Sequence, residues 1–159
     1  MKLHVARFDE LGPRTLYALL RLREEVFVVE QRCPYQDLDG RDTEPDTRHV
    51  WVVDGGSGDG PPLAYLRIVA EPGGAARIGR VCVAHSGRGA GLAGKLMRDA
   101  LELIGPHPCV LDAQAHLTAF YQGLGFTPSG AEFVEDGIPH VPMLREARPP
   151  APRSSAAGR

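Results

Sequence analysis

The segment from Arg80 to Ala93 constrains the fold of this chain more than any other part of its sequence. It begins with the β-branched residues of a strand, continues through a glycine-rich turn that contains Arg88, and ends at the start of an amphipathic helix. The first N–H groups of a helix have no intrahelical partner, and the helix dipole adds about half a positive charge there. Glycines let the backbone approach a phosphate closely, and an arginine can add a forked, charge-assisted contact. The segment therefore predicts a binding site for a pyrophosphate group.

Two ligands with a pyrophosphate group fit this segment, and a third interpretation needs no ligand. The glycines of Gly89–Gly94 have the G-x-G-x-x-G spacing of a dinucleotide fingerprint, and Asp112 follows at about the twenty-residue distance that this fingerprint requires. Arg88–Ala93 also reads R-x-x-G-x-A, which resembles the Q/R-x-x-G-x-G/A signature with which GNAT acetyltransferases bind the pyrophosphate of coenzyme A. The third interpretation is a tight turn rich in glycine.

The composition excludes several classes of function. The 159 residues are enough for one domain with a core, and 43% hydrophobic and 24% charged residues are usual for a globular chain. A net charge of −2 gives no basic field for nucleic acid, and no apolar run reaches the roughly twenty residues of a membrane helix. The N-terminal residues lack the apolar core of a secretory signal. We therefore expect a cytoplasmic protein without nucleic-acid or membrane partners.

Neither the cysteines nor the histidines have the spacing of a metal site. The three cysteines fit no zinc pattern, and an odd number cannot all pair within one chain, so reduced thiols are expected. His49, His116 and His140 could meet in space, but histidines that hydrogen-bond locally are far more common than metal ligands. We expect no bound metal.

Hydrophobic periodicity predicts alternating strands and helices. Strands are expected at residues 3–8, 49–54, 63–70, 76–84, 109–111, from 126 onward and at 140–144, and helices at 16–27, 92–104 and 117–124. Residues 55–62 are predicted to form a loop, and Asp136-Gly137 to turn a hairpin. The order predicts a mixed sheet with helices on its faces, of the α/β or α+β class. Residues 148–159 have no apolar anchor and are predicted to form a disordered tail.

Further segments make the resemblance to GNAT acetyltransferases more specific. Phe120–Phe126 reads F-Y-Q-G-L-G-F, which resembles the family's aromatic-Tyr-x-x-x-Gly-Phe segment, and Arg23–Gln31 resembles the first helix of many members. The segments similar to the ElaA-like branch of the family are Cys33–Gly40, Gln114–Leu117 and Ile138–His140. The resemblance implies the GNAT fold, in which helices flank a central mixed, mostly antiparallel sheet, in one domain over residues 1–147.

The resemblance also implies an N-acetyltransferase that moves an acetyl group directly from acetyl-CoA to an amine. The backbone of Gly89–Ala93 and the side chain of Arg88 would hold the pyrophosphate. The strand Val81–Val83 would part from its neighbour and pair with the amide arm of the cofactor, and the N–H of Val83 would polarise the thioester oxygen. The cofactor-binding residues implied in this way are Val81, Cys82, Val83, Arg88, Gly89, Ala90, Gly91, Leu92, Ala93, Gln114, Phe120 and Tyr121.

Tyr121 is the general acid that the resemblance implies, because a phenol is protonated at neutral pH and can donate to a departing thiolate. Without the family motif, the apolar stripe around Tyr121 would favour a core tyrosine. The general base stays open, because the strand Arg77–Val83 lacks the carboxylate that many relatives carry there. The candidates are Glu30, His116, Glu135, His140 and an ordered water.

Several alternatives remain open at this level. The missing strand carboxylate allows a non-catalytic coenzyme A binding or sensing module on the same fold, and the dinucleotide spacing allows an oxidoreductase. Cys82 allows a covalent acetyl intermediate, although valines flank it and direct transfer does not need it. The acidic residues of 37–46 predict a solvated loop or a negative mouth that attracts cationic amines. The acceptor is expected to be a small-molecule or protein amine, and a homodimer is expected only by analogy with relatives.

Overall fold

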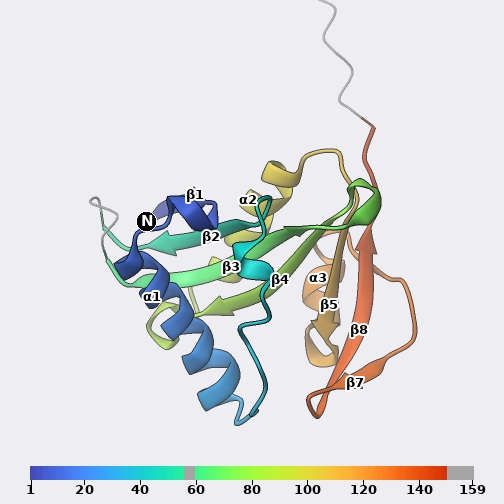
Figure 1. Cartoon of the computed structure of the whole chain (residues 1–159). Coiled ribbons are helices and arrows are strands. Elements are labelled where there is room, and N and C mark those ends of the chain that lie inside the picture. The colour runs from blue at the N-terminus through green and yellow to red at the C-terminus, as the bar shows by residue number, and fades with distance from the viewer. Residues whose placement is uncertain (56–59, 150–159) are drawn as a thin grey trace, which may run out of the picture.

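Two groups of antiparallel strands form the sheet, and one short parallel contact joins them (Figure 1). A computed structural model of the chain describes residues 1–55 and 60–149. The strand order is β1-β2-β3-β4-β5-β8-β6, and β7 pairs with β8. The strands are β1 (Lys2–Ala6), β2 (Arg48–Val53), β3 (Pro62–Ala70), β4 (Ala76–Val83), β5 (Cys109–Gln114), β6 (Thr127–Pro128), β7 (Phe133–Glu135) and β8 (Ile138–Arg145). The helices are α1 (Pro13–Arg23), α2 (Leu92–Ile104) and α3 (Thr118–Gln122).

Strands β4 and β5 separate soon after they begin. They pair only through the first two residues of each strand, and Figure 1 shows them diverging from there. β4 stays paired with β3, but the register shifts so that Arg80 and Val81 lie opposite the single residue Leu66. Arg80 has a φ of 55°, which is rare for a residue other than glycine. This arrangement is a β-bulge, and it bends β4 away from β5.

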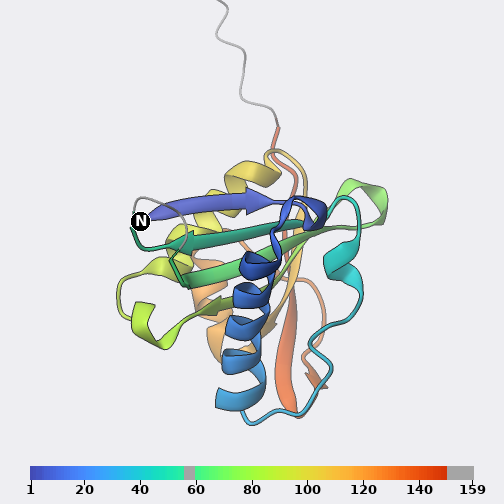
Figure 2. The ribbon, with the colours of Figure 1, turned by 60° about the vertical axis from the view of Figure 1, so that its left-hand side comes forward.

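Helices cover both faces of the sheet, α1 on one face and α2 with α3 on the other (Figures 1 and 2). Successive residues of a strand point to opposite faces, so the central strands contribute to two cores. Trp51, Val53 and Tyr65 pack with Leu19 and Leu22 of α1. The alternate residues of β2 and β3 pack with the apolar stripe of α2 and with α3 in the larger core. These strands are therefore buried on both sides, which explains their nearly continuous apolar sequence.

Helix α2 begins and ends where the sequence predicts. Gly91 precedes its first residue, and Gly105, with a φ of 69°, ends it. Leu103, in the last turn of this helix, is 38% exposed. The 3.6-residue period instead brings Leu101 and Ile104 to the sheet.

Other elements depart from the predicted bounds in instructive ways. The helix expected at 16–27 is α1, which continues as a π-helical segment over Glu24–Glu30. Its wider turns are closed by hydrogen bonds between residues five apart, as from the N–H of Cys33 to the carbonyl of Val28 at 3.1 Å. The helix expected at 117–124 is shortened to α3, and only its residue Tyr121 is buried. A π-helical segment such as Glu24–Glu30 often lies beside a functional site.

The C-terminal hairpin forms as predicted. Asp136 and Gly137 have φ values of 51° and 76° and connect β7 to β8. These values match the turn in which both central residues take positive φ. Of the loop expected at 55–62 and the tail expected at 148–159, residues 56–59 and 150–159 lie outside the described residues. Within the ranges described, none of the helices combines the length and the apolar character needed to span a bilayer.

Candidate active site

A cavity of about 950 Å³ lies where β4 and β5 part. Val81–Val83 of β4 and Leu111, Asp112 and Gln114 of β5 line it. The two strands have no ladder between them here, so their peptide groups on this side need other hydrogen-bond partners. An extended molecule with amide groups can supply them by adding to the sheet edge.

The glycine turn after β4 closes one end of the cavity, where Arg88 and Ala93 line it. Gly89 and Gly91 have φ values of 84° and 71°, which favour glycine. A Cβ at either position would meet no atom within 4 Å, so the two glycines leave an open surface in front of the turn. α2 begins immediately after Gly91, and the N–H groups of its first turn have no partner within the helix. This geometry suits an anion.

The dinucleotide interpretation of this turn is wrong. In dinucleotide-binding folds the third glycine lets the helix pack closely on a strand. A Cβ at Gly94 would instead meet the flexible end of Arg98, at 3.2 Å. Asp112, which that interpretation assigns to a ribose, lies 3.3 Å from a guanidinium nitrogen of Arg77. The sheet is also mainly antiparallel rather than doubly wound and parallel.

Arg88 is held beside the turn by Glu30, at the end of the π-helical segment. Its guanidinium donates two hydrogen bonds, of 2.6 and 2.7 Å, to the two carboxylate oxygens of Glu30. It also donates to the carbonyl of Val83. The hydrogen bond and the charge of Arg88 hold the pKa of Glu30 below its ordinary value. Glu30, a candidate general base from the sequence, is therefore an ionised partner of Arg88 at the glycine turn.

Tyr121 of α3 lies in the cavity wall and is only 6% exposed. Its ring contacts Phe120 and Phe126 edge to face, with centroid distances of 5.0 and 6.2 Å. Burial raises the pKa of Tyr121 to about 12. The phenol is thus protonated at neutral pH. Tyr121 therefore packs in the core and also lines the cavity, so a core role does not exclude the role of general acid.

Cys82 points toward α1 and belongs to the core on that face. Burial raises the pKa of its thiol to about 12. A nucleophilic cysteine needs an accessible thiolate, which this environment disfavours. The geometry thus argues against a covalent intermediate on Cys82.

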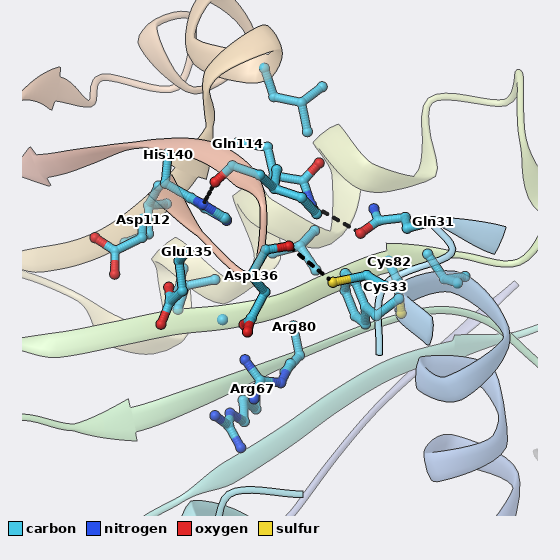
Figure 3. A pocket seen from close by; sticks show the side chains of 18 of the residues that line it. Gln31, Cys33, Arg67, Arg80, Cys82, Asp112, Gln114, Glu135, Asp136 and His140 are labelled. Atoms are coloured by element: carbon cyan, nitrogen blue, oxygen red, sulfur yellow. Dashed lines mark hydrogen bonds between the residues drawn. The ribbon is translucent and has the colours of Figure 1, made fainter. Parts of the chain in front are cut away.

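The segment that follows α1 also approaches the hairpin of β7 and β8, which lines another side of the cavity (Figure 3). His140 of β8 lies directly opposite Gln114 of β5 in the ladder. The Nε2 of Gln114 lies 3.4 Å from the Oε1 of Gln31, and the thiol of Cys33 donates to the carbonyl of Asp136 at 3.3 Å. These two contacts link the segment after α1 to β5 and to the β7–β8 hairpin.

A buried arginine fixes the loop that forms the next wall. Arg23 of α1 is fully buried, and its guanidinium donates to the carboxylates of Asp42 at 2.7 Å and Asp37 at 2.9 Å. Asp42 also accepts a hydrogen bond from Arg67 of β3, at 3.0 Å. Burial alone would raise the pKa of Asp42, but the hydrogen bonds and charges of the two arginines lower it below its ordinary value. Asp42 is therefore an ionised, buried carboxylate.

The same network continues to the strained residue of the β4 bulge. Asp39 accepts a hydrogen bond of 2.8 Å from Arg67, and Arg80 donates one of 2.9 Å to the carbonyl of Asp37. Asp37, Asp39 and Asp42 are thus neither solvated nor part of a negative mouth, because they pair with buried or half-buried arginines, whereas Asp46 of the same loop is exposed. These arginines were not predicted from the sequence. Arg67 was the available signal, because a charge in the middle of an apolar strand requires a buried partner.

The remaining candidates from the sequence occupy different places. His116 lines the cavity on the exposed turn before α3, and Glu135 lines it on β7. Phe120 also lines the cavity. His49 lies inside the protein, where its ring nitrogens contact the hydroxyl of Tyr65 at 2.8 Å and the carbonyl of Asp42 at 3.0 Å. Among residues 1–55 and 60–149, no three His, Cys, Asp or Glu side chains form a group that could hold a metal ion.

A mixed sheet that opens between two parallel strands, with a glycine turn and a helix N-terminus at the opening, defines the acyl-CoA N-acyltransferase class of folds. The chain belongs to the GNAT acetyltransferase family: the model of the acetyltransferase (GNAT) domain matches residues 23–147. Within this family it falls in the ElaA-like branch. Both assignments agree with the resemblance expected from the sequence.

Known proteins support this placement over most of the chain. A UPF0039 protein of Mycobacterium tuberculosis is 50% identical over 139 residues, which are 86% of this chain and 87% of that protein. Protein ElaA of Escherichia coli is 46% identical over 149 residues, 87% of this chain and 92% of ElaA, and its crystal structure superposes with a TM-score of 0.81. The crystal structure of an acyl-CoA N-acyltransferase from Pseudomonas aeruginosa has a TM-score of 0.84 and 41% identity, and the match covers 91% of this chain and 99% of that one.

Proposed function

We propose that the protein is an N-acetyltransferase that uses acetyl-CoA as donor and an amine as acceptor. The observation that carries the proposal is the opening between β4 and β5, which leads from the glycine turn to the far wall of the cavity. Membership of the GNAT family supports acyl transfer. The Pseudomonas aeruginosa structure is that of an acyl-CoA N-acyltransferase, which supports an acyl-CoA donor for this chain as well.

The donor would bind along the opening. The N–H groups of Gly89–Ala93 would hold the pyrophosphate, with Arg88 released from Glu30 to face it. The amide arm would add to the free edge of Val81–Val83, which would place the thioester beside Tyr121. Gln114 would contact the arm from β5. This orientation leaves the acceptor to enter from the side of the β7–β8 hairpin.

Two groups of the chain would then assist the transfer. The N–H of Val83 would donate to the thioester oxygen as negative charge develops there. One such hydrogen-bond donor contributes about 3 kcal/mol in acyl-transfer enzymes that have an oxyanion hole. The hydroxyl of Tyr121, kept neutral by burial, would donate its proton to the departing thiolate. Neither step needs the Cys82 thiol.

The hairpin end of the cavity favours a positively charged acceptor. Within the part of the chain that the structure describes, the carboxylates of Glu135 and Asp136 line the cavity and take part in no ion pair. The arginines that line the same end, Arg67, Arg77 and Arg80, are each paired with a carboxylate. An amine that is protonated in solution would be attracted to this end. A cytoplasmic location, where such an enzyme would meet acetyl-CoA, remains an expectation from the sequence.

Release of coenzyme A provides the direct test. Purified protein would be incubated with acetyl-CoA and, in turn, spermidine, glucosamine, lysine and a short peptide with a free N-terminus, while free thiol is measured. We expect amine-dependent thiol release, and a fall of about 100-fold or more in kcat for Tyr121→Phe, which keeps the ring contacts and removes only the hydroxyl. Binding of coenzyme A without thiol release would instead favour a non-catalytic coenzyme A module. Absence of coenzyme A binding would refute the donor site itself.

A further inference from the structure

His140 occupies a fixed and chemically defined position at the acceptor end of the cavity (Figure 3). Its Nδ1 lies 2.7 Å from the carbonyl oxygen of Ile138. A carbonyl oxygen can only accept, so Nδ1 carries the hydrogen and the lone pair of the neutral ring is on Nε2. The ring also stacks on Phe133 of β7, with centroids 5.6 Å apart and an interplanar angle of 19°. Both contacts restrain the imidazole and leave Nε2 for another partner.

The strand ladder places His140 and Tyr121 on opposite faces of the sheet. His140 is the cross-strand partner of Gln114, so their side chains share one face of the sheet with Asp112, two residues before Gln114. The intervening residues of these strands pack with Tyr121 in the core beneath α2 and α3. Both Tyr121 and His140 line the cavity between β4 and β5. A molecule in this opening therefore has the phenol on one side and the imidazole on the other.

Direct acyl transfer can use this arrangement. The amine adds to one face of the planar thioester carbonyl, and the thiolate then leaves from the tetrahedral intermediate, in which nitrogen and sulfur occupy different positions around the carbon. The acid has to reach the sulfur and the base the nitrogen, and groups on two different walls of the cavity can do so without competing for one place. Glu30, another candidate base from the sequence, is already bound through both carboxylate oxygens to Arg88.

We infer that His140 is the general base of the reaction, an inference that rests on the proposed N-acetyltransferase function. The amine nitrogen forms a bond to the acetyl carbon, and the bond from that carbon to sulfur breaks. One proton of the amine passes to Nε2 of His140, and the thiolate takes a proton from the hydroxyl of Tyr121. The imidazolium then loses its proton to solvent and the phenolate regains one, so the products are the N-acetyl amine and free coenzyme A.

The charged groups around His140 suit a base that becomes positive. Asp112 faces it from β5 and is paired with Arg77 of β4, and Glu135 and Asp136 approach it from the β7–β8 hairpin. Arg80 of β4, across the cavity, is neutralised by Asp37. The carboxylates would stabilise the imidazolium that forms during transfer, as an acidic partner does in other histidine bases. They would also attract the protonated form of the amine, which loses one proton to solvent before it attacks as the neutral amine.

Substitution of His140 by asparagine separates the chemistry from the structure. The amide nitrogen of Asn can take the place of Nδ1 and keep the hydrogen bond to Ile138, but it offers no base. We expect kcat/KM of His140→Asn, measured by thiol release with acetyl-CoA and the best of the four amines named above, to fall by about 100-fold or more. We also expect its pH profile to lose the limb that rises toward neutral pH. His140→Gln, which cannot make the same local bond, should lose as much activity.

Matched measurements distinguish the possible failures. His107→Gln, an exposed histidine outside the cavity, should retain wild-type kinetics. Melting temperature and the dissociation constant of coenzyme A should be unchanged in His140→Asn, so a loss of activity cannot be a loss of folding or of donor binding. Wild-type kcat/KM and pH profile in both His140 variants, or a rise in KM alone, would overturn the assignment of the base and leave the proposed function standing. Absence of turnover by the wild-type protein with every amine would overturn both.

Discussion

Replacement of Asp42 by asparagine removes one charge from the buried network and changes the side-chain volume little. Asp42 accepts hydrogen bonds from Arg23 at 2.7 Å and from Arg67 at 3.0 Å, and the three side chains are at most 9% exposed. With residue 42 uncharged, Arg23, Arg67 and Arg80 share only the carboxylates of Asp37 and Asp39, and one uncompensated buried charge costs about 3–5 kcal/mol. For a domain of this size, this loss lowers the melting temperature by about 6–20 °C. We therefore expect a large loss of stability from a single, nearly isosteric change.

Urea denaturation at several pH values tests this prediction. Because the pKa of Asp42 is lowered in the folded protein, its contribution is present above the pKa of an unfolded aspartate, about 3.9, and is lost as the pH falls through the lowered value. The difference between wild type and Asp42→Asn should thus be constant from pH 7 to about 4.5 and shrink below that range.

Asp46→Asn is the matched control, because Asp46 is exposed in the same loop, and it should change stability by less than about 0.5 kcal/mol. A loss below about 1 kcal/mol at pH 7 for Asp42→Asn, or a loss equal to that of the control, would refute the reasoning.

Three further predictions concern the opening between the strands. Glu30→Gln should bind coenzyme A more tightly in calorimetry, because Glu30 competes with the diphosphate for Arg88; weaker binding would contradict this. Gly91→Ala should bind coenzyme A more weakly and lose about 1–2 kcal/mol of stability in urea, because a side chain is strained at the φ of 71° that Gly91 adopts. Unchanged affinity and unchanged stability would show that this backbone conformation is not needed. Arg80→Gly should be more stable than Arg80→Ala by about 1 kcal/mol. Both variants lose the ion pairs of Arg80, but only glycine adopts a φ of 55° without strain. Equal stabilities of the two variants would argue against a strained bulge.

Local patterns were sufficient for the elements around the opening. The glycine turn, the start of α2 after Gly91 and the Asp136-Gly137 hairpin formed where they were expected, because positive φ and helix ends depend on the residues at those positions. The amphipathic character of α2 was also predictable from the sequence, although Leu103 in its last turn is exposed. The π-helical segment after α1 could not be foreseen, because its apolar residues also suit an ordinary helix.

The candidate site was predictable where backbone geometry defines it and unpredictable where distant side chains meet. The parting of β4 from β5 follows the family pattern, and the structure agrees with it. The pairing of Glu30 with Arg88, which are 58 residues apart, had no signal in the sequence. Because of this pairing, Glu30 binds Arg88 and is not assigned as the general base.

The chain's order of apolar, glycine and charged residues was enough to identify the family, the sheet with its covering helices and the place where an anion can bind, because these depend on neighbours close in sequence. The pairing of aspartates with Arg23, Arg67 and Arg80, and the hydrogen bond that fixes the ring of His140, emerged only after folding. The charge and proton affinity of such groups depend on burial and on partners many residues away, and those are properties of the packed molecule.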